Sequence, residues 1–239
     1  MNSIYFIKNQ GVFSAVFQAE NSGRLPEQPI NAILKTSRYI CKKVLVMINP
    51  DLFNELARNR RSVFPDQFEP GKKVDDAIIH EIMINAVWAP NHGRAEPWQF
   101  SVFTGGGLKK LAAFQSELYK QEAGDQFKEI TYNKLQKQPL KASHIIAIGM
   151  KRTSTKNIPE IEDIEAVACA VQNIYLSVTA YGIGGYWTTG GVTYFEKAKS
   201  FFGLDEQDRL LGFFYIGHVA IPSTGATRLP IQEKVKWIN

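Results

Sequence analysis

The sequence predicts an α+β domain in which helices flank a small mixed β-sheet. Two continuous apolar runs, HIIAIGM at 144–150 and RLLGFFYIGHVA at 209–220, are typical of central strands covered on both faces. Amphipathic helical segments lie between the predicted strands without a regular strand–helix–strand repeat. With 239 residues, 44% of them hydrophobic and 21% charged, the chain is ordinary for a globular protein of one domain or two.

The other elements follow from the spacing of apolar residues and from the positions of proline and glycine. Alternating apolar residues predict a strand at 97–104. Helical spacing predicts helices that start at Pro50 and cover 74–88, about 107–122 and 158–182. The helix at 158–182 is apolar nearly all round in its middle, which predicts burial by its own sheet or by a second subunit.

Residues 1–46 show no sustained periodicity, so we expect a poorly packed N-terminal extension ahead of a domain at 47–239. An alternative is that Met47 is the true start of the protein. The extension holds six Lys/Arg and two acidic residues, whereas the rest of the chain holds 22 basic and 21 acidic side chains. Most of the net charge of +5 therefore lies in the extension, and the nearly neutral body argues against nucleic acid as a partner.

The cysteines and histidines argue against several classes of site. Cys41 and Cys169 are far apart and lack metal-ligand spacing, so we expect no disulfide framework and a reducing, cytoplasmic setting. The four histidines also lack the spacing of a metal site, and no serine lies in a nucleophile-elbow context. We expect no membrane partner, because no apolar run approaches the roughly 18 residues that span a bilayer. We expect no signal peptide, because the N-terminal apolar run GVFSAVF is too short and follows only one lysine.

Two motifs have a composition suited to phosphate or cofactor binding. Arg60-Arg61-Ser62 ends the first helix, where the arginines either complement the helix C-terminus or grip a phosphate with their guanidinium groups. The segment YGIGGYWTTGG at 181–191 is not a dinucleotide fingerprint, because Trp187 replaces the third glycine and a helix precedes it. Its glycines either form turns or let the backbone approach a planar ring closely.

Five motifs follow one another along the chain: RRS at 60–62, AP…PWQF at 89–100, GIGGYW at 182–187, GFFYIGH at 212–218 and TRLP at 227–230. In this order they resemble the nitroreductase family, over roughly residues 50–235. The likeness is greatest to its short, single-domain bacterial members. The resemblance implies a nitroreductase-like fold that binds FMN and is completed by a homodimer partner.

Carried over residue by residue, the resemblance implies a flavin site with no catalytic side chain and no metal. The implied cofactor-binding residues are Arg60, Arg61, Ser62, Trp88, His92, Trp187, Thr188, Thr189 and Arg228. The arginines and Ser62 hold the phosphate and the ribityl chain, and the segment from Trp187 contacts the isoalloxazine. Because the family's pocket lies across a homodimer interface, we expect RRS and GGYWTT to reach one flavin from different chains.

Three positions depart from the family pattern. Phe64 stands where many relatives carry a further arginine, Arg94 replaces a frequent asparagine, and Glu96 replaces a glutamine. A mutual salt bridge of Arg94 with Glu96 that holds the loop's shape is at least as good an explanation as a catalytic role.

The resemblance implies an oxidoreductase that passes hydride from NAD(P)H through FMN to an electron-poor acceptor by a ping-pong mechanism. A nitroaromatic, a quinone or an activated alkene could serve as acceptor. One alternative is a protein that stores, senses or presents flavin without turnover. Another, which depends on residues 1–46 alone, is a basic protein associated with nucleic acid. The flavin hypothesis requires Arg60, Arg228 and Trp187 to line a common cavity, with neighbouring subunits included.

Overall fold

The computed structural model describes residues 5–9, 12–16, 49–153, 157–225 and 227–239. The chain divides into two compact units, 1–49 and 50–239, and each is described by itself. In the first unit, strand β1 (Tyr5–Asn9) pairs antiparallel with β2 (Val12–Val16). Met47 and Cys41 lie outside the described residues.

The second unit is built on a four-stranded sheet with the strand order β3-β4-β6-β5. The strands are β3 (Trp98–Thr104), β4 (His144–Met150), β5 (Gly184–Thr188) and β6 (Arg209–Gly217). The predicted strands are confirmed, and every residue of β4 is buried, as expected of a central strand. All pairings of this sheet are antiparallel, so the prediction of a mixed sheet was wrong.

Five α-helices accompany the sheet in the described part of the chain. They are α2 (Pro50–Asn59), α3 (Asp76–Val87), α4 (Gly106–Glu122), α5 (Glu129–Lys137) and α6 (Glu160–Ala180). Short 3-10 helices cover Pro65–Gln67, His92–Arg94, Gly124–Gln126, Gln138–Lys141, Glu196–Phe202 and Ile231–Glu233. The structure confirms the four predicted helices; α5 was not predicted.

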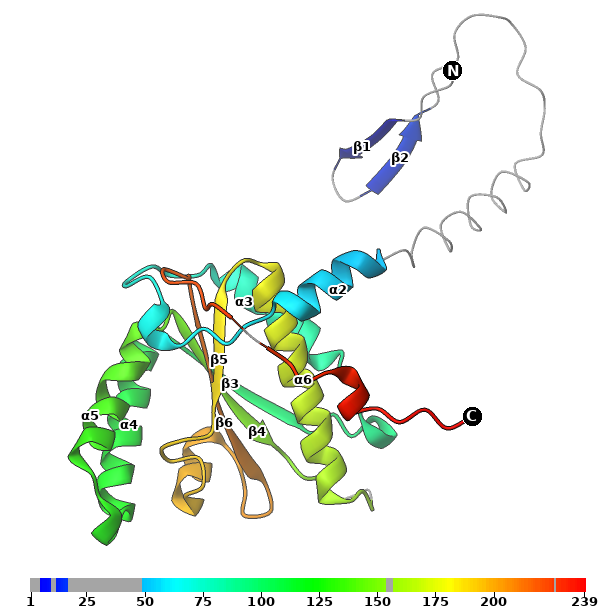
Figure 1. Ribbon diagram of the computed structural model, residues 1–239. Coiled ribbons are helices and arrows are strands. Elements are labelled where there is room, and N and C mark those ends of the chain that lie inside the picture. Colours follow the sequence, from blue (N-terminus) through cyan, green and yellow to red (C-terminus); the bar gives the residue numbers. More distant parts are fainter. Residues whose placement is uncertain (1–4, 10–11, 17–48, 154–156, 226) are drawn as a thin grey trace, which may run out of the picture. The chain divides into compact units, whose positions relative to one another are not determined.

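The helices cover the two faces of the sheet separately (Figure 1). Helices α4 and α5 pack on one face, and α3 and α6 pack on the other. Side chains that alternate along β6 serve both layers, because Phe213 points into the α4 core and Phe214 into the α6 core. Neighbouring residues of a strand therefore belong to different environments, and this alternation also divides the residues of β5.

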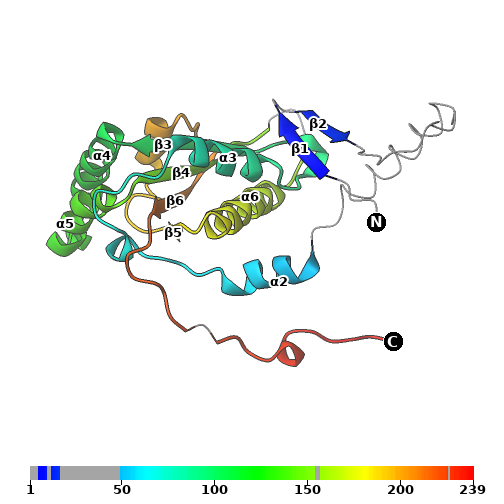
Figure 2. The same ribbon diagram turned by 90° about the horizontal axis from the view of Figure 1, so that it is seen from above.

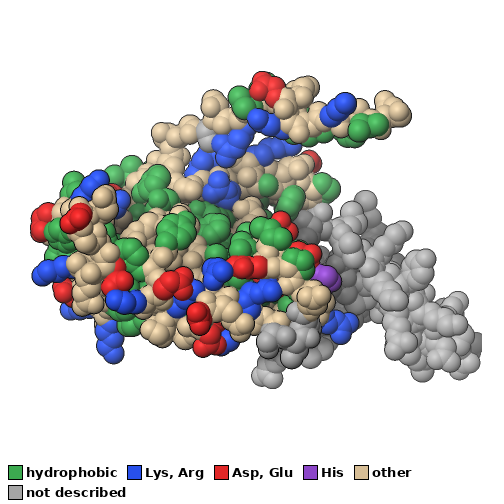
Figure 3. All heavy atoms as spheres, turned by 90° about the horizontal axis from the view of Figure 1, so that it is seen from below, with side chains coloured by type: hydrophobic (Ala, Val, Ile, Leu, Met, Phe, Trp, Pro, Cys, Tyr) green, Lys and Arg blue, Asp and Glu red, His purple; other side chains and the backbone are tan. Residues whose placement is uncertain are grey.

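Helix α2 and the C-terminal segment stand out from the layers around the sheet (Figure 2). Helix α2 contacts α6 but buries none of its residues, and Leu52 and Phe53 are 63% and 52% exposed. Trp237 and Ile238 are also exposed, on the extended segment that crosses the top of Figure 3. Within residues 50–239, as far as they are described, several large apolar side chains are thus exposed.

Among the described residues, no helix combines the length and the apolar character needed to cross a membrane.

Candidate functional site

The RRS segment and strand β5 meet at one side chain, Tyr175 of α6. The backbone N–H of Trp187 donates to the Tyr175 hydroxyl at 2.9 Å, and the Ser62 hydroxyl lies 3.4 Å from the same oxygen. The guanidinium carbon of Arg60 lies 4.7 Å from the centroid of the Tyr175 ring, within the range of a cation–π contact. Two predicted site segments, RRS and the one that contains Trp187, therefore share one partner that was not predicted.

A backbone hydrogen bond joins the RRS segment to β5 within one chain. The Val63 N–H donates to the Gly185 carbonyl at 3.0 Å, so the RRS segment is bonded to β5 of its own chain. Both segments therefore lie side by side in one chain.

Glycines at the start of β5 allow this close approach. A Cβ atom on Gly184 would lie 2.9 Å from the Cβ of Val63, and one on Gly185 would lie 2.6 Å from the Phe214 ring. Real Cβ atoms do not tolerate such distances. These two glycines neither form a turn nor face an open cavity; they make room for neighbouring side chains.

The two arginines of RRS behave differently. Arg61 Nη1 donates to the carbonyls of Arg58 and Arg60 at 2.6 and 2.9 Å, so it satisfies acceptors at the end of α2. The helix-terminus explanation therefore holds for Arg61. Arg60 is half-buried over Tyr175, and no carboxylate in the described part of the chain forms an ion pair with it. Arg60 is thus the better placed of the two to bind an anion.

The C-terminal segment begins beside the same cluster. The Ser223 hydroxyl donates to the Ser62 carbonyl at 2.7 Å, and Gln67 Nε2 donates to the Ile221 carbonyl at 3.1 Å. Arg228 lies five residues beyond Ser223, is exposed, and donates to the carbonyl of Thr227 at 3.0 Å. The described contacts therefore bring Ser223, rather than Arg228, to the RRS segment.

The side chains from Trp187 to Thr189 point in different directions. The Trp187 indole packs on the α6 side, and its Nε1–H donates to the Leu211 carbonyl at 2.9 Å. Thr188 faces the α4 and α5 side, where it lines a pocket, and Thr189 is exposed beyond the strand. The three side chains therefore cannot all contact one face of a ligand, whereas the backbone of this segment can.

Trp88 and His92 lie elsewhere, at the end of α3 and in the loop after it. Trp88 is 82% exposed, and His92 Nδ1 lies 2.5 Å from a carboxylate oxygen of Glu162 in the first turn of α6. Tyr175 follows Glu162 by thirteen residues on that helix, which corresponds to about 20 Å along its axis. Within one chain, His92 and the Tyr175 cluster thus lie at separate ends of α6.

The backbone of the loop is under local strain. Arg94 and Glu96 both adopt positive φ, 55° and 47°, which non-glycine residues rarely do. The Glu96 N–H donates to Asn91 Oδ1 at 3.0 Å, which helps to hold the bend. The proposed salt bridge of Arg94 with Glu96 stays a prediction.

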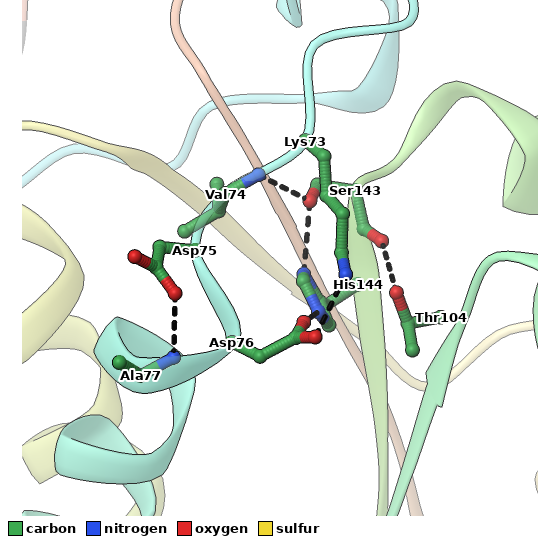
Figure 4. Close-up of polar contacts among 8 residues, drawn as sticks. All are labelled: Lys73, Val74, Asp75, Asp76, Ala77, Thr104, Ser143 and His144. Carbon is green, nitrogen blue, oxygen red and sulfur yellow. Dashed lines mark hydrogen bonds and ion pairs between the residues drawn. The ribbon is translucent and has the colours of Figure 1, made fainter.

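A separate polar cluster near the start of β4 has the composition of a catalytic triad (Figure 4). The Ser143 hydroxyl lies 2.9 Å from His144 Nδ1, and His144 Nε2 lies 2.8 Å from a carboxylate oxygen of Asp76. Burial lowers the pKa of His144, an effect that the hydrogen bond with Asp76 partly opposes. The hydrogen bonds with His144 and, above all, with Lys73 lower the pKa of Asp76.

This cluster ties α3 to β4 and does not present a nucleophile. His144 is 1% exposed, and the Ser143 hydroxyl accepts a 2.7 Å hydrogen bond from the Val74 N–H. His144 is therefore a buried structural residue. No group of three or more potential metal ligands occurs among the described residues.

Comparisons with known proteins identify the family. The family model described as "Nitroreductase family" matches residues 57–218. The chain is 30% identical over 176 residues to "Putative NAD(P)H nitroreductase YdjA" of Escherichia coli (strain K12), which covers 74% of this chain and 93% of the relative.

Solved structures agree in fold. The nitroreductase-like family protein from Bacillus cereus superposes with a TM-score of 0.66 at 28% identity, over 77% of this chain and 95% of that one. The FMN-dependent nitroreductase NfnB from Mycobacterium smegmatis, solved in complex with NADPH, gives 0.63 at 16% identity, over 80% and 99%. Since the family model covers most of the chain and its motifs stand in order, the chain belongs to the nitroreductase family.

Proposed function

We propose that this protein is an FMN-dependent oxidoreductase that passes hydride from NAD(P)H to an electron-poor acceptor. The observation that carries the proposal is the convergence of Arg60, Ser62 and the Trp187 backbone on Tyr175. Relatives whose names specify NAD(P)H, and structural neighbours described with FMN or NADPH, support the choice of cofactor and co-substrate.

The chemistry of the Tyr175 cluster fits a phosphorylated flavin. Arg60 offers a guanidinium without a described carboxylate partner, and Ser62 adds a hydroxyl beside it. Arg228 would add a second cation from the C-terminal segment. When bound, FMN would supply the two-electron redox chemistry, so the protein's tasks are binding and orientation.

Strand β5 would present its backbone to the flavin ring system. Tyr175 fixes the Trp187 amide, and the Leu211 carbonyl fixes its indole, so the following backbone at Thr188 and Thr189 starts from a held position. No side chain in this cluster is placed as a general acid or base. A ping-pong reaction, in which NAD(P)H would deliver its hydride and leave as NAD(P)+ before the acceptor enters, needs none.

We further propose that the site is completed in a homodimer. His92 contacts Glu162, about 20 Å along α6 from Tyr175, which is too far for both to share one flavin ring inside one chain. The uncovered apolar surface supports association, since exposed Leu52, Phe53 and Trp88 would be buried by a second copy. The RRS segment and β5 of one chain would then face Trp88 and His92 of the other. We place this enzyme in the cytoplasm, as its cysteine content predicts.

The absorbance spectrum of the purified protein tests the proposal. We expect flavin bands, and steady-state oxidation of NAD(P)H when a nitroaromatic acceptor is added. A protein that takes up no flavin when FMN is supplied contradicts the proposal, and one that binds FMN without turnover is a storage or sensor protein instead. Sedimentation, with a dimer as the expected result, tests the assembly separately.

A further inference from the structure

The pocket between α4, α5 and the end of β5 has an unbalanced charge. Lys134 of α5 is the one charged residue among the described residues that line it. The rest of the lining is neutral and consists of hydroxyls, two amides, two glycines and apolar side chains. Burial raises the pKa of Tyr215, so its phenol adds no negative charge. A ligand group in this pocket therefore meets positive charge only.

Two nitrogen donors of this pocket lack partners in the described part of the chain. Lys134 is exposed, and no described carboxylate forms an ion pair with it, whereas Lys197 and Lys199 pair with Glu122 and Glu196 at 2.7 and 2.5 Å. Gln115 of α4 is 1% exposed, and its amide group has no hydrogen-bond partner. An anion is a ligand group that an ammonium and an amide N–H both bind.

The pocket is part of the flavin site that we propose. It is lined by Thr188, Gly190 and Gly191, and the backbone of this segment would face the isoalloxazine. An acceptor must approach the flavin to about 3–3.5 Å to receive a hydride. Because the pocket is small, about 190 Å³, such an acceptor would lie within range of the Lys134 charge, which is screened only beyond about 8 Å in physiological salt.

We propose, on the basis of the function proposed above, that Lys134 selects electron-poor aromatic acceptors that carry a carboxylate. Its ammonium group would pair with that carboxylate, and the hydroxyl and amide groups of the lining can donate further hydrogen bonds. In the net two-electron reaction, R–NO2, NAD(P)H and a proton would give R–NO, NAD(P)+ and water. The carboxylate takes no part in this reaction, so Lys134 determines the choice of acceptor and not the chemistry.

Calorimetric titration of the FMN-saturated protein with 4-nitrobenzoate and with 4-nitrobenzamide tests this selection. The two probes share the ring and the nitro group, but only the first is ionised at neutral pH. We expect Lys134→Met to weaken 4-nitrobenzoate binding about three- to fivefold, the size expected of one exposed ion pair, and 4-nitrobenzamide binding less than about twofold. The ratio of kcat/KM for the two probes should shift by the same factor.

The matched control is Lys137→Met, because Lys137 is exposed on the same helix but does not line the pocket. It should leave both dissociation constants unchanged. Salt provides a second measurement, on the wild type alone. Raising NaCl from about 50 mM to about 500 mM should weaken the binding of 4-nitrobenzoate but not that of 4-nitrobenzamide.

Three outcomes overturn the selection by Lys134: neither probe binds, Lys134→Met weakens both probes alike, or Lys137→Met has the same effect as Lys134→Met. A loss common to both probes would mean that Lys134 acts on the flavin or on packing and not on the charge of the acceptor. A protein without flavin absorbance after addition of FMN contradicts the proposed function itself, and the role of Lys134 with it. A flavoprotein that reduces 4-nitrobenzamide but fails the Lys134 comparison contradicts the role of Lys134 alone.

Discussion

The two ends of α6 are built in different ways. Around Tyr175, in its later turns, half-buried groups are joined by hydrogen bonds to backbone and by a cation–π contact. Around Glu162, in its first turn, an exposed carboxylate meets an exposed histidine on a strained loop. The first end is organised by contacts within one chain, whereas the second holds a solvent-exposed ion pair.

The difference suggests how one binding site is divided between two copies. The Tyr175 end holds Arg60 and the backbone of β5 together within one chain. In the homodimer that we propose, His92 would reach the flavin from the second chain. Mutations at the two ends should therefore differ in what they damage, and the following predictions run from the largest expected effect to the smallest.

Arg60→Ala should produce the largest loss of FMN affinity. A charge-assisted hydrogen bond contributes about 1.5–3 kcal/mol, which corresponds to roughly a tenfold to hundredfold weaker Kd. Fluorescence titration of FMN measures it. Arg228→Ala should weaken binding in the same direction, and Arg94→Ala, on the strained loop, is the matched control. Equal affinity of all three variants contradicts the assignment of Arg60.

Tyr175→Phe should damage both stability and FMN binding, by less than Arg60→Ala damages binding. The substitution keeps the ring under Arg60 but leaves the Trp187 N–H without its 2.9 Å acceptor. A part-buried donor that loses its partner costs about 1–2 kcal/mol of unfolding free energy. Urea unfolding measures this cost.

The control for Tyr175→Phe is Tyr181→Phe, because Tyr181 is exposed just after the same helix. It should change neither the unfolding free energy nor the Kd for FMN. If Tyr175→Phe is as stable as Tyr181→Phe, the hydroxyl does not organise this end of α6.

The stability of the protein should depend on pH through the buried pair of His144 with Asp76, for which the exposed pair of His92 with Glu162 is the comparison. His144 is buried against Asp76, and its pKa in the folded protein is lowered below 6.5, mainly by burial. As pH falls, the unfolded chain takes up this proton first. The stabilisation is therefore complete above the unfolded-state pKa and is lost as pH falls through the lower folded-state value.

Urea unfolding of the wild type and His144→Gln across mildly acidic pH checks this prediction. The wild type should lose stability more steeply as pH is lowered, because only it carries the histidine. Parallel slopes for the two proteins would show that His144 titrates alike in the folded and unfolded states. The same comparison with His92→Gln serves as the exposed counterpart.

Most of the fold could be predicted because the spacing of apolar residues and the positions of proline and capping residues are local signals. The apolar run of β4, Pro50 at the start of α2 and Asp75 before α3 each determine local structure; Asp75 caps α3 by accepting from the Ala77 N–H at 2.9 Å. Strand β5 was missed because it opens with two glycines, which lower strand propensity. The direction of strand pairing was also missed, since it depends on how connections cross the sheet.

The site could be predicted only in part, for a similar reason. The motifs RRS and GGYWTT indicate chemistry by their own residues, but Tyr175 is one of several aromatic or apolar residues in a long helix. Nothing local says which of them faces segments more than 100 residues before it or 12 residues after it. A phenol inside an apolar helix does signal that its hydroxyl needs a partner. Which partner it finds is a property of the tertiary structure.

Glu162→Gln should have the smallest effect, because it removes a charge from a solvent-exposed pair. The side chains of His92 and Glu162 are 60% and 39% exposed, and such pairs contribute about 0–1 kcal/mol, less in high salt. We expect a change in unfolding free energy near the lower end of that range, indistinguishable from Glu165→Gln on the same helix. A loss of unfolding free energy as large as that of Tyr175→Phe would mean that contacts within one chain organise this end of α6. It would contradict the proposal that His92 acts in the site of a second chain.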